Sequence, residues 1–595
     1  MKENIVNMIL ERASRYNSRE VFRFKKAGSK IYESISWESF AGESQKVSRA
    51  LISLGIRPSD NIGIFSDNRP EWVISDIGII GIRSVVVPFY ATSSKQQLKY
   101  IADETQMRLI FVGNREQYEK ALWLLNNTET LKKIVVFDSG IAPDNDCCIG
   151  WRKFVSLDSE NRFEMEMKQR IQEIQPNDLV TIIYTSGTTG ESKGVMLTHA
   201  TFLYTFKIHD ERLEVSDTDI SACFLPLSHV FERTWTYYIL YRGATNAFID
   251  NPREIIDQLP IVKPNLMCTV PRFFEKTCEG IQSEMSKWPS LKKKIFNWSI
   301  KIGLKYSEYL SKAQKPPLGL SLRHGVADIL VLRKLRNIFG GKIRFMPCAG
   351  AAISPSLVRF FHAAGIFINY GYGATETSAT VSCFKSDRYD FDTCGTIMPG
   401  IEVKISEEGE ILIKGGTVFK SYYKKSEETG KTLIDGWYHS GDQGYITSNG
   451  DLVMTDRIKD LMKTSSGKYV SPQKIELAFG QDPFIEQIIA IGDNRKFITA
   501  LIVPSFETLK SKGRLGLQTM DNSELVVSKE IIEFYNGRVN KIQEEFAPYE
   551  RVVRFKLLPE SFSIQNGMLT NTLKVRRNML IEQFKDDIDK MYLAG

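Results

Sequence analysis

Short apolar runs alternate with helical patterns between residues 61 and 138, and no other feature constrains the fold of this chain as strongly. The apolar runs predict strands at Ile62–Phe65, Ser84–Pro88, Leu109–Val112 and Ile134–Phe137. The segments between them predict helices at Glu71–Ile80, Lys95–Asp103 and Gln117–Leu125. This alternation indicates a parallel sheet with covering helices, because each helix carries the chain back to begin the next strand in the same direction.

A second set of apolar runs predicts a second sheet of the same kind. We expect its strands at Leu179–Ile183, Ala222–Leu225, Ala247–Ile249, Leu266–Thr269, Ile343–Met346 and Ile366–Asn369. The expected fold class is therefore α/β, with two doubly wound sheets packed together in a large N-terminal domain. After about residue 400 the pattern changes to short alternating strands, such as Ile411–Lys414, and a hairpin signal at Asn449-Gly450. This change predicts a small β subdomain.

The length of 595 residues is too great for one hydrophobic core and predicts at least two domains. We place the large domain at residues 1–455. The remaining residues, 456–595, read as a compact α+β domain of typical small-domain length.

Composition limits the classes of function. The 42% hydrophobic and 25% charged content are typical of a soluble globular protein. A net charge of +7 is too dilute to favour nucleic acid, and it fits an anionic substrate and weak contact with an acidic membrane equally well. The eight cysteines show no metal-binding spacing and predict reduced thiols in a cytoplasmic protein. No signal peptide is predicted, and Asp76 and Arg83 interrupt the most apolar window, Trp72–Phe89, so no membrane span is expected.

A long basic segment, Ser283–Phe339, reads as helical, with three lysines at 292–294 and a break at Pro316-Pro317. A solvated helical insertion is the favoured interpretation. A surface that makes peripheral contact with a membrane is the alternative that stays open.

The segment between Tyr184 and Val195 reads YTSGTTGESKGV and combines five hydroxyl residues and three glycines with Lys193. Glycines let successive N–H groups point at an anion, and the hydroxyls and the lysine add donors and positive charge. This composition fits a polyphosphate site, although a flexible polar turn is the alternative. The Walker A pattern is absent. The string resembles the signature loop of the adenylate-forming superfamily, with Ser192 where that family usually has proline. The resemblance implies ATP binding by Thr185, Ser186, Gly187, Thr188, Thr189, Gly190 and Lys193.

A second stretch, INYGYGATETS at 368–378, resembles the adenine and Mg²⁺ segment of the same superfamily. Its glycines allow a flat ring to approach the backbone, an aromatic ring can stack on that ligand, and a carboxylate suits Mg²⁺ beside phosphates. The resemblance implies nucleotide binding by Gly371, Tyr372, Gly373 and Thr375, and Mg²⁺ binding by Glu376, with Thr188 as a further ligand. It also implies that Gly350, Ala351 and Ala352 line the adenine pocket.

Three further segments match the superfamily in the expected order. Asp442, in WYHSGDQG, is expected in a tight Gly-flanked turn; an Asx-turn is the structural interpretation, and the resemblance implies a carboxylate on the ribose. Arg457 resembles the ribose-binding arginine, and Lys459 falls at the hinge position. The string KTSSGKYVSPQKIE at 463–476 resembles the CoA-side loop, which would include Gly467 and Lys468.

Two candidate catalytic residues lie far apart in the sequence. His229, in LPLSH, taken alone reads as structural, and the resemblance places it at the acyl carboxylate and the thiol tunnel. Lys574, in MLTNTLKVRR, resembles the adenylation lysine and joins His229, Glu376 and Lys193 as the expected catalytic set. The aromatic cluster Phe231, Trp235, Tyr237 and Tyr238 fits the wall or gate of an acyl tunnel and ordinary core packing equally well.

Within the superfamily, PRFFEK at 271–276 and LPLSHVFER at 225–233 most resemble long-chain fatty-acid–CoA ligases. The resemblance implies that ATP, Mg²⁺ and coenzyme A act on a long-chain fatty acid through an acyl-adenylate, and that the C-terminal domain is mobile. Two alternatives remain: ligation of another acid or of a carrier-protein thiol, and a non-catalytic nucleotide-binding or membrane-associated scaffold. Nucleic acid is not expected as a partner. The oligomeric state, monomer or homodimer, stays open.

Overall fold

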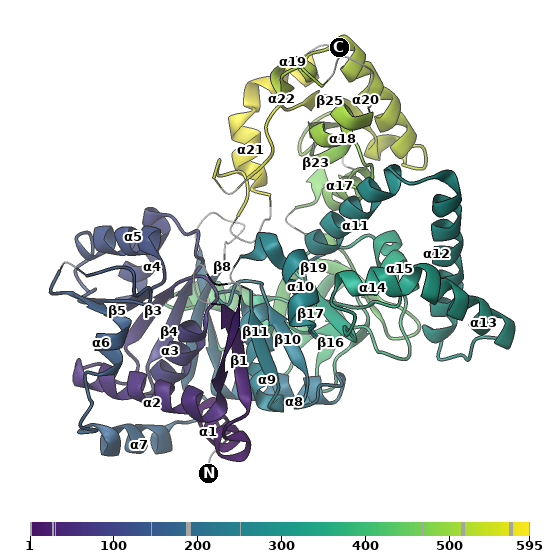
Figure 1. Ribbon diagram of the computed structural model, residues 1–595. Coiled ribbons are helices and arrows are strands. Elements are labelled where there is room, and N and C mark those ends of the chain that lie inside the picture. Colours follow the sequence, from purple (N-terminus) through teal and green to yellow (C-terminus); the bar gives the residue numbers. More distant parts are fainter. Residues whose placement is uncertain are drawn as a thin grey trace.

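Residues 3–25, 29, 31–143, 145–185, 192–249, 251–458, 460–465, 468–512, 518–563, 565–570 and 575–593 are described by the computed structural model (Figure 1). A seven-stranded sheet forms the first α/β unit in the order β7-β6-β5-β3-β4-β8-β9, with every neighbouring pair parallel except β8 and β9. Its strands are β3 Asn61–Phe65, β4 Val85–Phe89, β5 Leu109–Val112, β6 Lys133–Val136, β7 Cys148–Gly150, β8 Leu179–Thr185 and β9 Lys193–Thr198. The four strands predicted between residues 61 and 138 are confirmed.

One strand was assigned to the wrong sheet. The run at 179–183 was predicted to begin the second sheet, but β8 lies beside β4 in the first, where the Thr181 hydroxyl donates to the Val86 carbonyl at 2.8 Å. An apolar run shows that a strand is buried but carries no information on which strand it pairs with, so the pattern alone could not make this assignment.

The second sheet begins with the N-terminal hairpin β1 and β2, followed by β11 and β10. Single bridges at Leu266 and Thr269 join this half to β12, β13, β14 and β15. Its strands are β1 Glu20–Lys25, β2 Tyr32–Ser36, β10 Ile220–Cys223, β11 Thr245–Phe248, β12 Phe345–Cys348, β13 Phe367–Tyr372, β14 Ser382–Cys383 and β15 Thr396–Ile397. The hairpin was not predicted, because polar and apolar residues are mixed in both strands and only Val21 and Phe22 among them are buried.

Helices fill the space between the two sheets and cover both outer faces (Figure 1). The inner layer, whose apolar residues join one core with both sheets, contains α1 Ile5–Tyr16, α2 Trp37–Ser53, α3 Pro70–Gly81, α8 His199–Asp210 and α9 Val230–Arg242. The first sheet is covered outside by α4 Lys95–Thr105 and α5 Arg115–Leu125. The second is covered by α10 Ile255–Val262, α11 Pro271–Ser286, α12 Ser290–Leu310, α14 Arg333–Ile338 and α15 Pro355–Ala363. The predicted pair of packed α/β sheets is confirmed.

The β subdomain follows as an antiparallel sheet of β16 Glu402–Ile405, β17 Glu410–Lys414, β18 Leu433–Ile434, β19 Trp437–Ile446 and β20 Leu452–Arg457. The predicted hairpin turn at Asn449-Gly450 joins β19 to β20, with Gly450 at φ +80°. The short helix α16 Ser426–Thr432 lies between β17 and β18 in sequence.

The last part of the chain is built on the three-stranded sheet β23 Ile485–Ile491, β24 Ile498–Pro504 and β25 Val552–Leu557. Alternate strand residues enter two cores, one shared with α17 Pro472–Phe479 and α20 Lys529–Ile542, the other with α21 Arg577–Gln583 and α22 Lys585–Leu593. Helices therefore cover both faces of this sheet, and Figure 1 shows the unit at the top of the molecule. The boundary at residue 455 remains a prediction.

The basic segment is helical, as predicted. After α12 the chain breaks at Pro316-Pro317 and continues through α13 Leu318–Ala327, the π-helical turn η2 Asp328–Leu332 and α14. Among the described residues, no helix has the length and apolar character needed to cross a membrane. All eight cysteines are free thiols, as predicted, and six of them are buried.

Candidate active site

Lys193 stands at the mouth of the hairpin formed by β8 and β9, opposite Thr185 in the strand register. Residues 186–190 of the predicted phosphate loop lie outside the described residues. The segment 420–423 runs antiparallel along β9: the Tyr423 amide donates to the Gly194 carbonyl at 2.8 Å, and Tyr422 bridges Val195. This pairing places the Lys193 ammonium 5.2 Å from the centre of the Tyr422 ring and in an ion pair with Glu428.

Glu376 lies in the short turn η3 Thr375–Thr377, directly after β13. The Tyr422 hydroxyl donates to its Oε1 at 2.8 Å, and burial raises the pKa of the Glu376 carboxyl. Tyr422 therefore contacts both Lys193 and Glu376, which are 183 positions apart in the sequence. Sequence reasoning missed Tyr422 and Glu428, because nothing in the run SYYKKSEE shows that it pairs with β9.

The predicted ribose group assembles from three elements. Asp442 on β19 and Arg457 on β20 face each other in the strand register, with Arg457 Nε 3.1 Å from Asp442 Oδ1. The Tyr372 hydroxyl, from the end of β13, donates to Asp442 Oδ2 at 2.5 Å. The side chain of Asp442 is only 5% exposed. The structure thus brings together a buried carboxylate, a half-exposed guanidinium and a phenol.

The tight turn predicted around Asp442 is wrong. Residues 437–446 form the strand β19, in which Gly441 has a φ of +70° and the pairing with β17 and β20 shifts register. The Gly441 amide donates to Glu410 at 2.8 Å, and the Ser440 hydroxyl donates to the Ile411 carbonyl at 2.7 Å. These bonds to β17 hold the glycine kink within the strand, so glycines that flank an aspartate were mistaken for a tight turn.

The adenine segment after β12 combines open and crowded glycines. Gly350 adopts φ +92° with open space beside it, and Ala351 is exposed while Ala352 is half-buried. At Gly371 a side chain would meet the Ser382 carbonyl at 2.4 Å, and at Gly373 it would meet the Ala379 carbonyl at 2.1 Å. Close packing of the strand that follows therefore requires these two glycines, whether or not a nucleotide approaches them. Thr375 is buried beside them.

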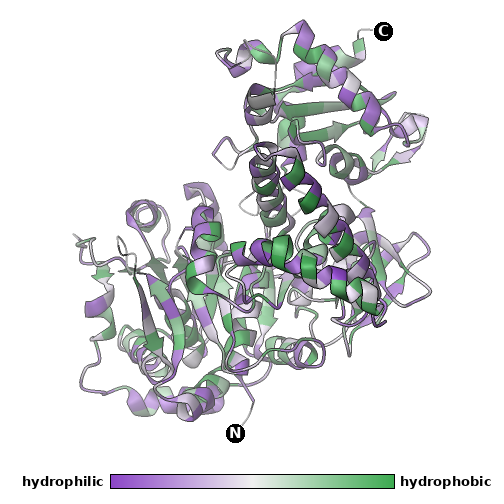
Figure 2. Ribbon diagram, turned by 45° about the vertical axis from the view of Figure 1, so that its right-hand side comes forward, coloured by the Kyte–Doolittle hydropathy of each residue, from purple (hydrophilic) through white to green (hydrophobic). Residues whose placement is uncertain are grey.

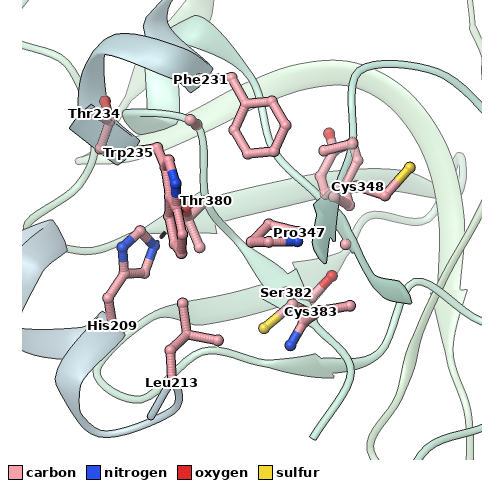
Figure 3. Close-up of a pocket in the computed structure, with 15 residues that line it drawn as sticks. His209, Leu213, Phe231, Thr234, Trp235, Pro347, Cys348, Thr380, Ser382 and Cys383 are labelled. Atoms are coloured by element: carbon pink, nitrogen blue, oxygen red, sulfur yellow. Dashed lines mark hydrogen bonds between the residues drawn. The ribbon is translucent and has the colours of Figure 1, made fainter. Parts of the chain in front are cut away.

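A small cavity of about 40 Å³ lies between α9 and the second sheet (Figure 3). Phe231, Thr234 and Trp235 line it from α9, and Ala349, Gly371 and Tyr372 line it from the predicted adenine side. On its α8 side, His209 Nε2 lies 2.9 Å from the Thr380 hydroxyl. Phe231 and Trp235 therefore line a cavity next to the predicted adenine segment, and their role at an acyl tunnel stays a prediction.

The other two aromatic residues of that cluster pack into the core. The Tyr237 hydroxyl donates to Asp76, and the Tyr238 hydroxyl donates to Asp210. Arg233 forms two bonds to the same Asp76, at 2.9 and 2.5 Å, with both side chains fully buried. Asp76, which interrupts the apolar window in the sequence, is therefore an internal ion-pair partner that ties α3 to α9.

His229 caps the start of α9, where its Nδ1 accepts the Phe231 amide at 3.2 Å. The imidazole is half-buried and lies outside the lining of the cavity. Its predicted catalytic role stays a prediction, while its capping role is visible in the structure.

The residues predicted on the C-terminal side are only partly described. Lys468 is exposed and closes a small hairpin between β21 Met462–Lys463 and β22 Tyr469–Val470, where its carbonyl accepts the Thr464 amide at 2.9 Å. Lys459, Gly467 and Lys574 lie outside the described residues.

Within the described ranges, no three His, Cys, Asp or Glu side chains gather as a metal-binding group. Mg²⁺ is usually held by one or two carboxylates together with substrate phosphates and water. The half-buried carboxylate of Glu376, which Tyr422 holds close to the hairpin of β8 and β9, fits that mode of binding.

Comparison with known proteins shows which family this chain belongs to. The model of the family described as AMP-binding enzyme matches residues 9–423, and that of the AMP-binding enzyme C-terminal domain matches residues 459–594. The chain therefore belongs to the AMP-binding enzyme family. The fold is similar to that of solved structures: the anthranilate CoA ligase AuaEII has a TM-score of 0.74 at 17% identity, with 99% of this chain and 98% of that chain covered. O-succinylbenzoate coenzyme A synthetase from Bacillus subtilis, solved with ATP and magnesium, has a TM-score of 0.67 at 16% identity, covering 96% and 98%.

Among characterised relatives, this chain is similar to long-chain-fatty-acid–CoA ligases. Long-chain-fatty-acid–CoA ligase 5 of Rattus norvegicus is 32% identical, covering 94% of this chain and 84% of the relative. Long-chain-fatty-acid–CoA ligase FadD15 of Mycobacterium bovis is 29% identical, covering 94% and 93%. The predicted resemblance to long-chain fatty-acid–CoA ligases is confirmed.

Proposed function

We propose that this protein converts a long-chain fatty acid to its CoA thioester, using ATP and releasing AMP and pyrophosphate. The similarity to long-chain ligases over nearly the whole chain supports this activity over the alternatives of a carrier-protein ligase or a scaffold. The observation that carries the proposal is one assembly: the polar group of Tyr372, Asp442 and Arg457 adjoins a largely apolar cavity, because Tyr372 belongs to both.

The polar group suits the nucleotide. A buried carboxylate that already accepts a phenol hydroxyl and faces a guanidinium is held in one orientation, and it can accept both hydroxyls of a ribose. Nearby, the phosphate hairpin offers the Lys193 ammonium, and Glu376 would hold Mg²⁺, which supplies positive charge at the phosphates when bound. We assign Lys193 to the phosphates of the nucleotide. When the nucleotide binds, the Lys193 ammonium would leave its ion pair with Glu428 and contact a phosphate instead.

The reaction proceeds in two balanced steps. A carboxylate oxygen of the fatty acid attacks the α-phosphorus of ATP, the bond to the bridging oxygen breaks, and pyrophosphate leaves. The thiol sulfur of CoA then attacks the acyl carbon, AMP leaves with the shared oxygen, and the thiol proton is lost to solvent. Negative charge gathers at the α-phosphate in the first step, and we assign Lys574 to neutralise it, since one well-placed donor of this kind contributes about 10²–10³ in rate.

The second step needs a thiol where the lysine stood. We propose that the small C-terminal domain rotates about Lys459 between the steps, so that the loop with Gly467 and Lys468 replaces Lys574 at the acyl-adenylate. His229 is assigned to the junction of the acyl carboxylate and the thiol path. The cavity that Phe231 and Trp235 line is assigned to the first part of the acyl chain.

The free cysteines suit a reducing compartment, and we propose that the protein works in the cytoplasm with peripheral contact to membranes.

AMP and pyrophosphate release against saturated acids of C4 to C20, with CoA and with a carrier protein as acceptors, tests the proposal. We expect release that depends on acids of C12 and longer and on CoA for thioester formation. Each buried methylene contributes about 0.8 kcal/mol, or about fourfold in affinity, so four methylenes separate chain lengths by about two orders of magnitude. Release that is independent of any fatty acid would overturn the activity.

The assignment of Lys574 is tested by separating the two steps. Lys574→Ala should lose formation of the acyl-adenylate and still convert a supplied acyl-adenylate to the thioester. Lys590→Ala, a surface lysine of the same domain, is the matched control and should keep both steps. Equal loss of both steps in Lys574→Ala would remove the assignment.

A further inference from the structure

An apolar stripe runs along the outer face of α13 and η2, and no other described part of the chain covers it. Leu318, Leu322, Val326 and Ile329 are 85%, 75%, 52% and 66% exposed. Their spacing of four, four and three residues places them on one face of a helix. The opposite face, with Leu320, Ala327 and Leu332, packs on Ile302 of α12. The stripe is about 18 Å long at the usual helical rise, and exposed apolar residues this regular mark an interaction surface.

The stripe lies within a basic helical region, although α13 and η2 themselves contain one basic and one acidic residue, Arg323 and Asp328. Residues 290–338 contain eleven lysines and arginines and two acidic residues, a net charge of +9, while the whole chain carries +7. The rest of the molecule is therefore slightly negative, at −2. Exposed cations flank the stripe at both ends and along its length: Lys312, Lys315, Arg323, Arg333 and Lys334.

The two acidic residues among residues 290–338 neutralise little of the positive charge there. Asp328 bonds to Arg336 at 2.6 Å and lies 3.6 Å from Arg333, and it is itself mostly buried. Glu308 is exposed on α12. On α12, exposed Lys294, Lys301 and Lys305 recur at intervals of seven and four residues, so they share a face of that helix.

We propose that α13 and η2 dock this protein on the surface of an anionic lipid bilayer. The apolar stripe would enter the boundary between headgroups and acyl chains, while the flanking cations contact lipid phosphates. A second copy of this chain would also cover apolar residues, but pairing this face with itself brings two segments of +9 together, which opposes association. In Figure 1 α13 lies at the edge of the molecule, and Figure 2, with that side turned forward, shows hydrophobic and hydrophilic bands along its helices.

Docking on a bilayer would place the proposed enzyme next to its substrate. This purpose rests on the proposed function, whereas the binding to lipid does not. Long-chain acids partition into bilayers, so an enzyme held on the bilayer works where such a substrate is concentrated. Binding to lipid requires no ATP, acid or CoA, and it is therefore measured without them. A protein that binds vesicles and forms no AMP would contradict the proposed reaction alone, and an active protein that ignores vesicles would contradict the docking alone.

Sedimentation of the full-length protein with vesicles tests the proposal. Vesicles of phosphatidylcholine with 30% phosphatidylglycerol should bind it at low salt, and pure phosphatidylcholine should bind it at least tenfold more weakly. The double variant Leu318→Asp/Leu322→Asp should lose at least tenfold in binding to anionic vesicles. Arg323→Gln and Lys334→Gln should each lose about fivefold, the usual contribution of one basic residue near such a surface.

Met165→Asp and Val527→Asp are matched controls, because these apolar residues are 78% and 72% exposed on other elements. Both should bind vesicles as the unaltered protein does. All variants should keep their thermal midpoint and their AMP formation with a detergent-dispersed acid, since the altered side chains lie in solvent. Absence of binding to anionic vesicles, or equal binding by the Leu318→Asp/Leu322→Asp variant, overturns the proposal. A dimer in solution that this variant converts to a monomer would assign the stripe to a second copy and would overturn it as well.

Discussion

Glu232, on α9, is a fully buried carboxyl whose proton should couple the stability of the large domain to pH. Its Oε2 accepts the amide of Leu225 at 3.2 Å, which ties the segment leading to His229 onto the helix. Burial raises the pKa of Glu232 from 4.5 to about 8, although hydrogen bonds from Cys223, Leu225 and Thr236 act in the opposite direction. At neutral pH the carboxyl is therefore protonated in the folded protein and ionised in the unfolded chain.

The sign of the effect follows from the raised pKa. The folded state holds a proton that the unfolded state has released, so this contribution to stability is complete below pH 4.5 and disappears as pH rises through about 8. Each pH unit in that interval removes about 1.4 kcal/mol. Between pH 6 and pH 9 the loss amounts to about 2–3 kcal/mol, a substantial part of the stability of a typical domain.

Glu232→Gln isolates this contribution. The amide has nearly the same shape, its oxygen can accept the Leu225 N–H, and it carries no titrating proton. Denaturant unfolding at pH 6 and pH 9 should show the stability of the unaltered protein falling by about 2–3 kcal/mol more than that of the variant. Glu129→Gln, at an exposed position, is the control and should follow the unaltered protein. Equal pH dependence in Glu232→Gln and the unaltered protein would refute the reasoning, since the carboxyl would then ionise alike in both states.

Three further predictions use the same kind of argument. Asp442→Asn should keep the fold and weaken AMP binding by about 10–100-fold, because a charged hydrogen bond contributes about 1.5–3 kcal/mol. Calorimetric titration with AMP measures this affinity. An unchanged affinity would remove Asp442 from the ribose site. Arg233→Met should destabilise the protein by about 3–5 kcal/mol, because it leaves the buried carboxylate of Asp76 unpaired. The double variant Asp76→Leu/Arg233→Met should recover most of this stability, as measured by denaturant unfolding. No recovery would mean that the pair acts through packing. Burial lowers the pKa of His209 to about 3, so its contribution to stability is complete above pH 6.5 and is lost as pH falls toward 3. His209→Gln should therefore lose less stability than the unaltered protein between pH 6.5 and pH 4, and an identical loss would contradict the assignment.

Much of the fold follows from local patterns in the sequence. The strands between residues 61 and 138 are correct because each is a short apolar run bounded by a helix, and burial on both faces of a parallel sheet requires that composition. The assignment of β8 failed because pairing depends on contacts between distant segments. The hairpin of β1 and β2 was missed for a related reason, since half-exposed strands carry a weak apolar signal.

The site divides in the same way. Tyr372, Asp442, Arg457 and Glu376 each stand in a recognisable string, and the structure brings the first three into one hydrogen-bonded group. Tyr422 could not be found from its neighbours, because its position depends on the backbone pairing of residues 420–423 with β9. Contacts made by backbone pairing are independent of side-chain identity, so they leave little trace in a single sequence.

The spacing of the residues on α9 could have divided its aromatic cluster into two groups. In a helix, residues four apart share a face, so Phe231 and Trp235 form one pair and Arg233 and Tyr237 form another on a different face. The structure follows this division: the first pair lines the cavity, and the second binds Asp76 in the core. Helical phase alone could therefore have separated wall from core. It could not have shown which face meets the cavity, because that depends on where the second sheet lies. A single helix thus builds the proposed acyl site on one side and anchors it with a buried ion pair on the other.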